Sequence, residues 1–107
     1  MNNNTILNRE FKTGKLLQTS GIRRACESVV FNSFIWKSIE RHKNNDWGDC
    51  CADDWKANDE AIDTEARIFS VYKVPEKLKE ISRSDKIWII TEADSRDSTT
   101  ILFPNEY

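Results

Sequence analysis

Apolar residues recur at helical spacing between Glu27 and Lys43, which predicts an amphipathic helix over this range. The residues that share its apolar face are Phe31, Phe34, Ile35, Ser38, Ile39 and His42, and the neighbouring Val30 and Trp36 are predicted to widen this apolar stripe. The helix ends on three basic residues, which complement the negative end of its dipole. Asn44, Asn45 and Asp46 then end it, because their side chains bond to nearby backbone and compete with helical hydrogen bonds.

A second, shorter helix is predicted from Asp49 to about Asp63, with Asp49 as its N-cap. One face of this helix carries Cys51, Trp55, Asn58 and Ile62. Its interior contains poor helix formers, so we expect packing rather than intrinsic propensity to hold it in place.

The other predicted elements are strands, because their sequences are rich in β-branched and aromatic residues. These strands are Lys15–Ile22, Arg67–Val74, Lys86–Glu92 and Thr99–Pro104. Lys86–Glu92 is apolar on both faces, which favours a central position in the sheet. The charged connection before it carries one helical turn, Glu76–Ile81. The chain is therefore predicted to be an α+β fold, with an approximately four-stranded, mainly antiparallel sheet and two helices packed on one face.

The length of 107 residues predicts a single domain. Residues 1–13 are polar and are expected to form a loose N-terminal segment, so that the domain comprises residues 14–107. No apolar run is long enough to span a membrane, and no signal peptide is recognisable. The three cysteines show no disulfide framework, which is typical of a reducing compartment. We therefore expect a cytoplasmic protein without a membrane partner.

The stretch from Arg41 to Trp55 contains the only His and two of the three Cys of the sequence. Cys50 at a helix start has the setting of a reactive thiolate, and His42 is a possible base for it. Asp46 and Asp49 add carboxylates, and the same group contains metal-binding side chain types. One hypothesis is therefore a small metal- or thiol-dependent hydrolase centred on His42, Asp46, Asp49 and Cys50.

The alternative is that this stretch is a structural corner made of His42, Asp46, Trp47, Gly48 and Asp49. Adjacent cysteines on a helix project about 100° apart, which disfavours a shared small ion. No C-x-x-C, H-E-x-x-H, P-loop or dinucleotide fingerprint occurs in the sequence. We therefore favour the structural corner and expect no catalytic residue, no metal and no cofactor.

Charge is unevenly distributed although the formal net charge is only −2. Residues 45–65 contain eight acidic side chains and one basic one, whereas residues 9–24 contain five basic side chains and one acidic one. The acidic helix is predicted to bind a basic partner surface through Asp53, Asp54, Asp59 and Glu60, with Trp55 as an apolar anchor. The overall charge disfavours direct nucleic-acid binding.

Several runs resemble a family of small uncharacterised bacterial proteins from plasmids, phages and other mobile elements, some labelled plasmid-related or as restriction–modification subunits. The similar runs are Thr19–Ile22, Arg41–His42, Asp46–Asp49, Asp54–Asn58, Arg67–Tyr72, Lys86–Asp94 and Thr99–Pro104. The resemblance covers approximately residues 14–107. It implies no known activity or cofactor, and the chain lacks methyltransferase and nuclease motifs.

These observations together predict a mobile-element-encoded interaction protein. It is expected to bind and inhibit a host protein or nucleoprotein complex that has a basic surface, such as a CRISPR or other defence effector. The expectation rests on the small size, the acidic helix and the associations of the family.

Overall fold

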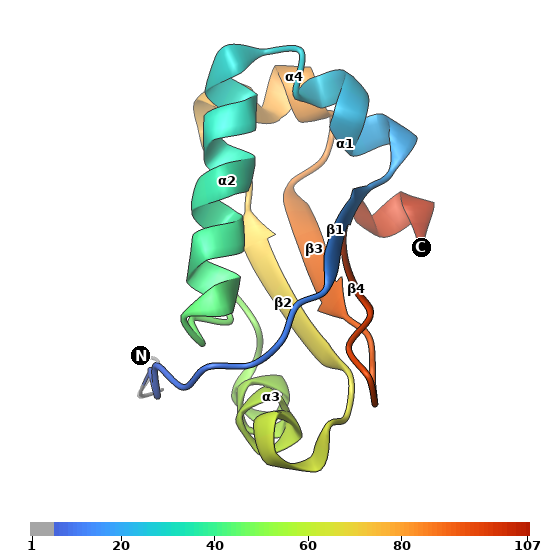
Figure 1. The fold of residues 1–107 in the computed structure, drawn as a ribbon. Helices are drawn as coiled ribbons and strands as arrows, with labels where there is room; N and C mark the ends of the chain where they lie inside the picture. Colours follow the sequence, from blue (N-terminus) through green and yellow to red (C-terminus); the bar gives the residue numbers. More distant parts are fainter. Residues whose placement is uncertain (1–5) are drawn as a thin grey trace.

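The computed structural model describes residues 6–107 of the chain. The elements are β1 (Lys15–Gln18), α1 (Ser20–Ala25), α2 (Val29–Lys43), α3 (Ala52–Thr64), β2 (Ile68–Lys73), the short 3-10 turn η1 (Glu76–Leu78), α4 (Lys79–Ser82), β3 (Lys86–Thr91), β4 (Ser98–Leu102) and the 3-10 turn η2 (Pro104–Glu106). Figure 1 shows α2 lying along the sheet, with α1 and α4 at one end of the strands and α3 at the other.

The four strands form one sheet in the order β1-β4-β3-β2, which confirms the predicted α+β fold. β3 pairs antiparallel with both β2 and β4, so it is a central strand. β1 pairs parallel with β4, with Leu16 opposite Thr99. The sheet is therefore mixed rather than purely antiparallel.

The main core lies between α2 and one face of the sheet, which we call the inner face. Ser28 caps α2 by accepting a hydrogen bond from the Phe31 N–H. Phe31, Ile35 and Ile39 of α2 are buried against inner-face residues such as Ile89 of β3. Burial of each such side chain contributes about 1.5–3 kcal/mol, so this interface is the main source of stability for the helix.

α3 begins later than the sequence predicts. Its N-cap is Cys51, not Asp49, because the Asp49 carboxylate accepts a hydrogen bond from the Lys73 N–H in β2. The predicted first strand also ends early, at Gln18, and Ser20–Ala25 forms α1 instead. The Glu106 carboxylate accepts a hydrogen bond from the Gly21 N–H of this short helix, a contact that no local pattern reveals.

Residues 6–14 form neither helix nor strand, and several of them contact the domain. The Arg9 backbone exchanges hydrogen bonds with the Asn45 side chain, and its guanidinium pairs with Asp63. The Phe11 ring packs against His42 and Trp47. This segment therefore covers the end of the core where α2 finishes. No helix among residues 6–107 has the length and apolar character needed to cross a membrane.

Candidate functional site

His42 is fully buried near the C-terminal end of α2, and both of its ring nitrogens have partners. Nδ1 lies 2.6 Å from Ser70 Oγ of β2, and Nε2 lies 2.8 Å from Thr91 Oγ1 of β3. Thr91 Oγ1 in turn lies 2.7 Å from Thr99 Oγ1 of β4. A single polar chain thus links α2 to three strands of the sheet.

The hydrogen-bond directions in this chain fix the state of the imidazole. Thr99 Oγ1 donates its only proton to the Thr13 carbonyl oxygen at 2.7 Å, so it accepts from the Thr91 hydroxyl. Thr91 Oγ1 then accepts from His42 Nε2–H. The Ser70 hydroxyl donates to His42 Nδ1 at 2.6 Å rather than to the Ile89 carbonyl oxygen, which is more distant at 3.4 Å. The neutral Nε2–H tautomer therefore satisfies every member of the chain.

Burial is the main cause that lowers the pKa of His42 to about 3, and the nearby positive charge of Arg96 contributes to this shift. A general base must reach the proton it abstracts, and this ring is enclosed and fully hydrogen-bonded. The geometry gives His42 a structural role, because its ring forms hydrogen bonds with the buried hydroxyl groups of Ser70 and Thr91 in the sheet.

Cys50 is also buried, and its Sγ contacts the backbone carbonyls of Trp47 and Phe69 at 3.3 and 3.4 Å. Burial is the main cause that raises its pKa to about 11, so the thiolate is disfavoured. The structure does not place Cys50 against His42, whose two nitrogens bond to Ser70 and Thr91. Within residues 6–107, no three His, Cys, Asp or Glu side chains gather as a metal site would require.

The bend from Asp46 to Asp49 covers the free edge of β2. Val71 of β2 donates its N–H to the Trp47 carbonyl and accepts from the Asp49 N–H, so that Gly48 pairs with it as a parallel bridge. Gly48 has a φ of +74°, and an added Cβ would lie 2.0 Å from the Val71 carbonyl oxygen. Only glycine fits here without displacing the strand.

Asp46 supports the same bend. Its carboxylate accepts from Arg41 Nε at 2.7 Å and from the Gly48 N–H at 3.1 Å, and its carbonyl accepts from the Tyr72 hydroxyl at 2.8 Å. These bonds tie the end of α2 to the start of the bend and to β2. His42, Asp46, Trp47, Gly48 and Asp49 thus all make contacts that hold the edge strand and the helices together.

Asn58 of α3 completes the coverage of this edge, a role that the sequence does not indicate directly. Its side chain accepts from the Phe69 N–H at 3.0 Å and donates to the Phe69 carbonyl at 2.7 Å. The amide thereby replaces one residue of a neighbouring strand. The sequence offers one signal for this role: Asn58 lies on the apolar face of the predicted helix, where a buried amide without a hydrogen-bond partner would be destabilising. Covered edges do not pair with other chains, so β2 is protected from edge-to-edge association.

The acidic residues of α3 divide into an exposed and an engaged set. Asp53, Asp54 and Glu60 are exposed, whereas Asp59 is half-buried and accepts from Trp47 Nε1 at 2.9 Å. Trp55 is only 5% exposed and packs in a core cluster with Trp47 and other residues. The structure therefore corrects the expectation that Trp55 is an interface anchor, because its ring is needed to fix α3 to the sheet.

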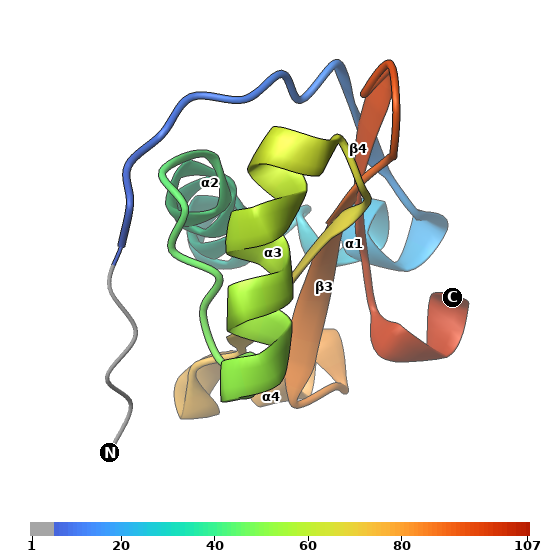
Figure 2. The same ribbon diagram turned by 90° about the horizontal axis from the view of Figure 1, so that it is seen from below.

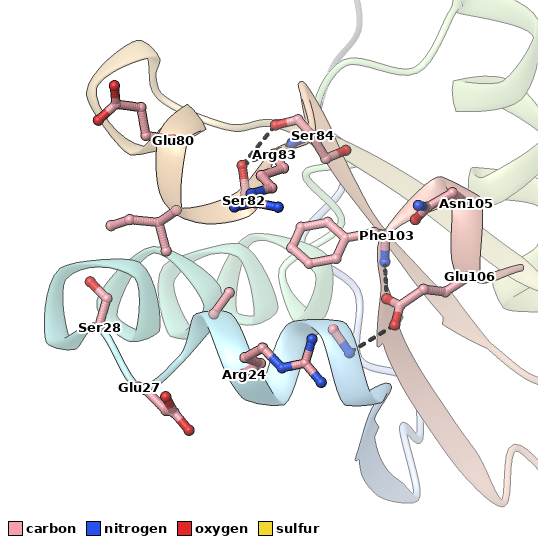
Figure 3. A pocket seen from close by; sticks show the side chains of 13 residues that line it. Arg24, Glu27, Ser28, Glu80, Ser82, Arg83, Ser84, Phe103, Asn105 and Glu106 are labelled. Carbon is pink, nitrogen blue, oxygen red and sulfur yellow. Dashed lines mark hydrogen bonds between the residues drawn. The ribbon is translucent and has the colours of Figure 1, made fainter.

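A hollow of about 670 Å³ lies between α1, α4 and the C-terminal turn. Figure 3 shows Phe103 between Arg24 of α1 and Ser82 of α4, with the Glu106 carboxylate bonded to backbone N–H groups. The other charged residues that line it are of both signs: Arg24, Arg83, Glu27 and Glu80. This mixture defines no single class of ligand.

The fold and these contacts define a small α+β protein with a covered sheet edge and an acidic helix. Comparison with protein-family models, with curated proteins and with solved structures found no significant match.

Proposed function

We propose that this protein is a non-enzymatic interaction protein that binds a basic partner surface through the exposed face of α3. The observation that carries the proposal is that Asp53, Asp54 and Glu60 are exposed and that none of them forms an ion pair with another residue of the described chain. Acidic side chains without internal partners are available to cations of another molecule.

The rigidity of α3 supports the same proposal. Trp55 and Ala61 are buried beneath the helix, and Asn58 bonds it to β2. Asp53 and Asp54 lie in its first turn, where the helix dipole stabilises negative charge. A surface that is already ordered loses little conformational entropy on binding, so a modest number of ion pairs gives useful affinity.

The kind of partner is proposed from the resemblance to plasmid- and phage-encoded proteins. A host protein or nucleoprotein complex with a basic groove, such as a CRISPR or other defence effector, has the complementary charge, and occupation of that groove would inhibit it. The hydrolase alternative receives no comparable support, because His42 and Cys50 are both buried.

A pull-down from a bacterial host with the tagged protein tests this proposal. The variant Asp53→Lys, Asp54→Lys, Glu60→Lys should lose a partner that the wild type captures, and capture should weaken between about 0.05 and about 0.5 M salt. The matched control reverses Glu27, Glu40 and Glu80, which are also exposed but lie outside α3. Equal capture by the wild type and the α3 variant would refute the assignment of this surface.

A further inference from the structure

The sheet face opposite α2, which we call the outer face, has a distinct charge. Within the described chain, the four strands contain three lysines and no Asp or Glu. Strand alternation places Lys73 of β2 and Lys86 of β3 on the outer face, opposite each other in register. Lys15 of β1 also lies on the outer face. Its partner Ser98 faces outward, because the next residue, Thr99, faces the core.

Arg67, directly before β2, continues the outer-face alternation at the other end of that strand. Because β1 and β2 both start at the end of the sheet where β3 finishes, Lys15 and Arg67 lie at one end and Lys73 and Lys86 at the other. None of the four forms an ion pair with a residue in 6–107. Glu92 is exposed and directly follows β3, where it continues the outer-face alternation of that strand with an acidic side chain.

Aromatic rings lie between these two pairs of cations. Phe69 and Trp88 meet edge to face with centroids 5.0 Å apart, and Tyr107 meets Trp88 at 5.8 Å. The Tyr107 side of this group is open, since Tyr107 is 72% exposed. Arg67 donates to the Tyr107 hydroxyl at 2.8 Å, which holds this residue across the sheet. Figure 2 shows α2 and the C-terminal turn on opposite sides of β3, so the long helix α2 lies across the sheet from the C-terminus.

We propose that the outer face binds single-stranded nucleic acid, with unpaired bases stacked on Trp88 and Tyr107 and phosphates contacting the cations at the two ends of the sheet. Aromatic rings flanked by Lys and Arg on a sheet are a combination that binds single strands, because every base has a face that stacks on an aromatic ring. Here Tyr107 is exposed and Trp88 is half-buried beside it. A duplex hides these faces, so it fits the phosphate-binding positions but not the rings. The overall charge disfavoured nucleic-acid binding. The outer face is nevertheless positive, because the net charge also counts the acidic residues of α3.

The inference goes beyond the proposed function and uses different residues. The α3 surface and the outer face can bind the same partner, since a nucleoprotein complex presents both basic protein surface and nucleic acid. Each can fail alone, because the α3 variant tests the first and outer-face variants test the second.

Fluorescence anisotropy with labelled oligothymidine and oligouridine of about 15 nucleotides tests the proposal at low salt. The wild type should bind at least one of them, and the difference between the two shows whether DNA or RNA is preferred. The variant Lys73→Glu, Lys86→Glu should weaken binding by about tenfold or more and reduce its salt dependence. Tyr107→Ala should weaken it by about fivefold or more through lost stacking.

The matched control is Lys37→Glu, Lys77→Glu, which makes the same change in net charge at exposed positions elsewhere. It should retain nearly the wild-type affinity, and circular dichroism checks that each variant is folded. The proposal is overturned if the wild type binds neither oligonucleotide, if the control weakens binding as much as the outer-face variant, or if a duplex of the same length binds as tightly.

Discussion

The burial of His42 predicts a specific loss of stability in mild acid. The pKa of this ring is 6.5 in an unfolded chain and about 3 in the fold, so the unfolded state takes up the proton first. Stability from this residue is therefore fully present above about pH 6.5 and decreases as the pH falls toward 3. At about 1.4 kcal/mol per pKa unit the full effect is about 5 kcal/mol, of which about 2 kcal/mol is lost by pH 5.

Two measurements check this reasoning. Urea unfolding followed by tryptophan fluorescence between about pH 7.5 and 4.5 should show the loss, and the variant His42→Gln should show a flatter dependence on pH. NMR titration of the wild type is independent of any variant, because the sequence contains one His. A ring signal that titrates near pH 6.5 in the folded protein would refute the neutral, enclosed imidazole, as would equal pH slopes for the two proteins.

Two further predictions concern contacts that α3 makes. Trp47→Phe should destabilise the protein by about 1–2 kcal/mol more than Trp55→Phe in urea unfolding, because Trp47 Nε1 donates to Asp59 whereas the buried Trp55 Nε1 has no partner among the described residues. Equal losses would contradict this difference. Asn58→Ala should lower the free energy of unfolding by about 2–3 kcal/mol and increase self-association in light scattering, because it uncovers the edge of β2 at Phe69. An unchanged midpoint of urea unfolding would count against edge coverage.

Thiol labelling at pH 8 should modify exposed Cys51 quickly, with Cys50 modified only on unfolding, and a rapid reaction of Cys50 would contradict its burial.

The sequence predicted the parts of the fold that depend on local patterns. The stripe that includes Ile35 and Ile39 located α2, and the double-sided apolar run of β3 placed that strand in the middle of the sheet. Trp36, which the pattern added to the apolar stripe, is 53% exposed, because it lies beyond the arc that contacts the sheet. Periodicity thus identifies a helix face more securely than its width.

What the sequence could not give depends on contacts between distant segments. The short helix α1 includes a glycine and is held by Glu106, and the parallel pairing of β1 with β4 joins strands that are far apart in the chain. Neither leaves a local signal. The position of Trp55 is different, because its spacing with Asn58 already placed it on the apolar face of α3. A Trp that a helix needs for packing is not also available as an anchor for a partner.

The arrangement of charge is the physical link between the two proposals. α3 carries exposed acids at one end of the molecule, while Lys73, Lys86, Lys15 and Arg67 occupy a sheet face whose strands contain no acid. Surfaces of opposite sign on one small domain cannot both bind a uniformly charged partner. They can bind a partner that is itself divided, as protein bound to nucleic acid is, because each surface then meets its complement. Capture of a partner recognised in this way should weaken at high salt, and it should also weaken when the nucleic acid of the partner is digested.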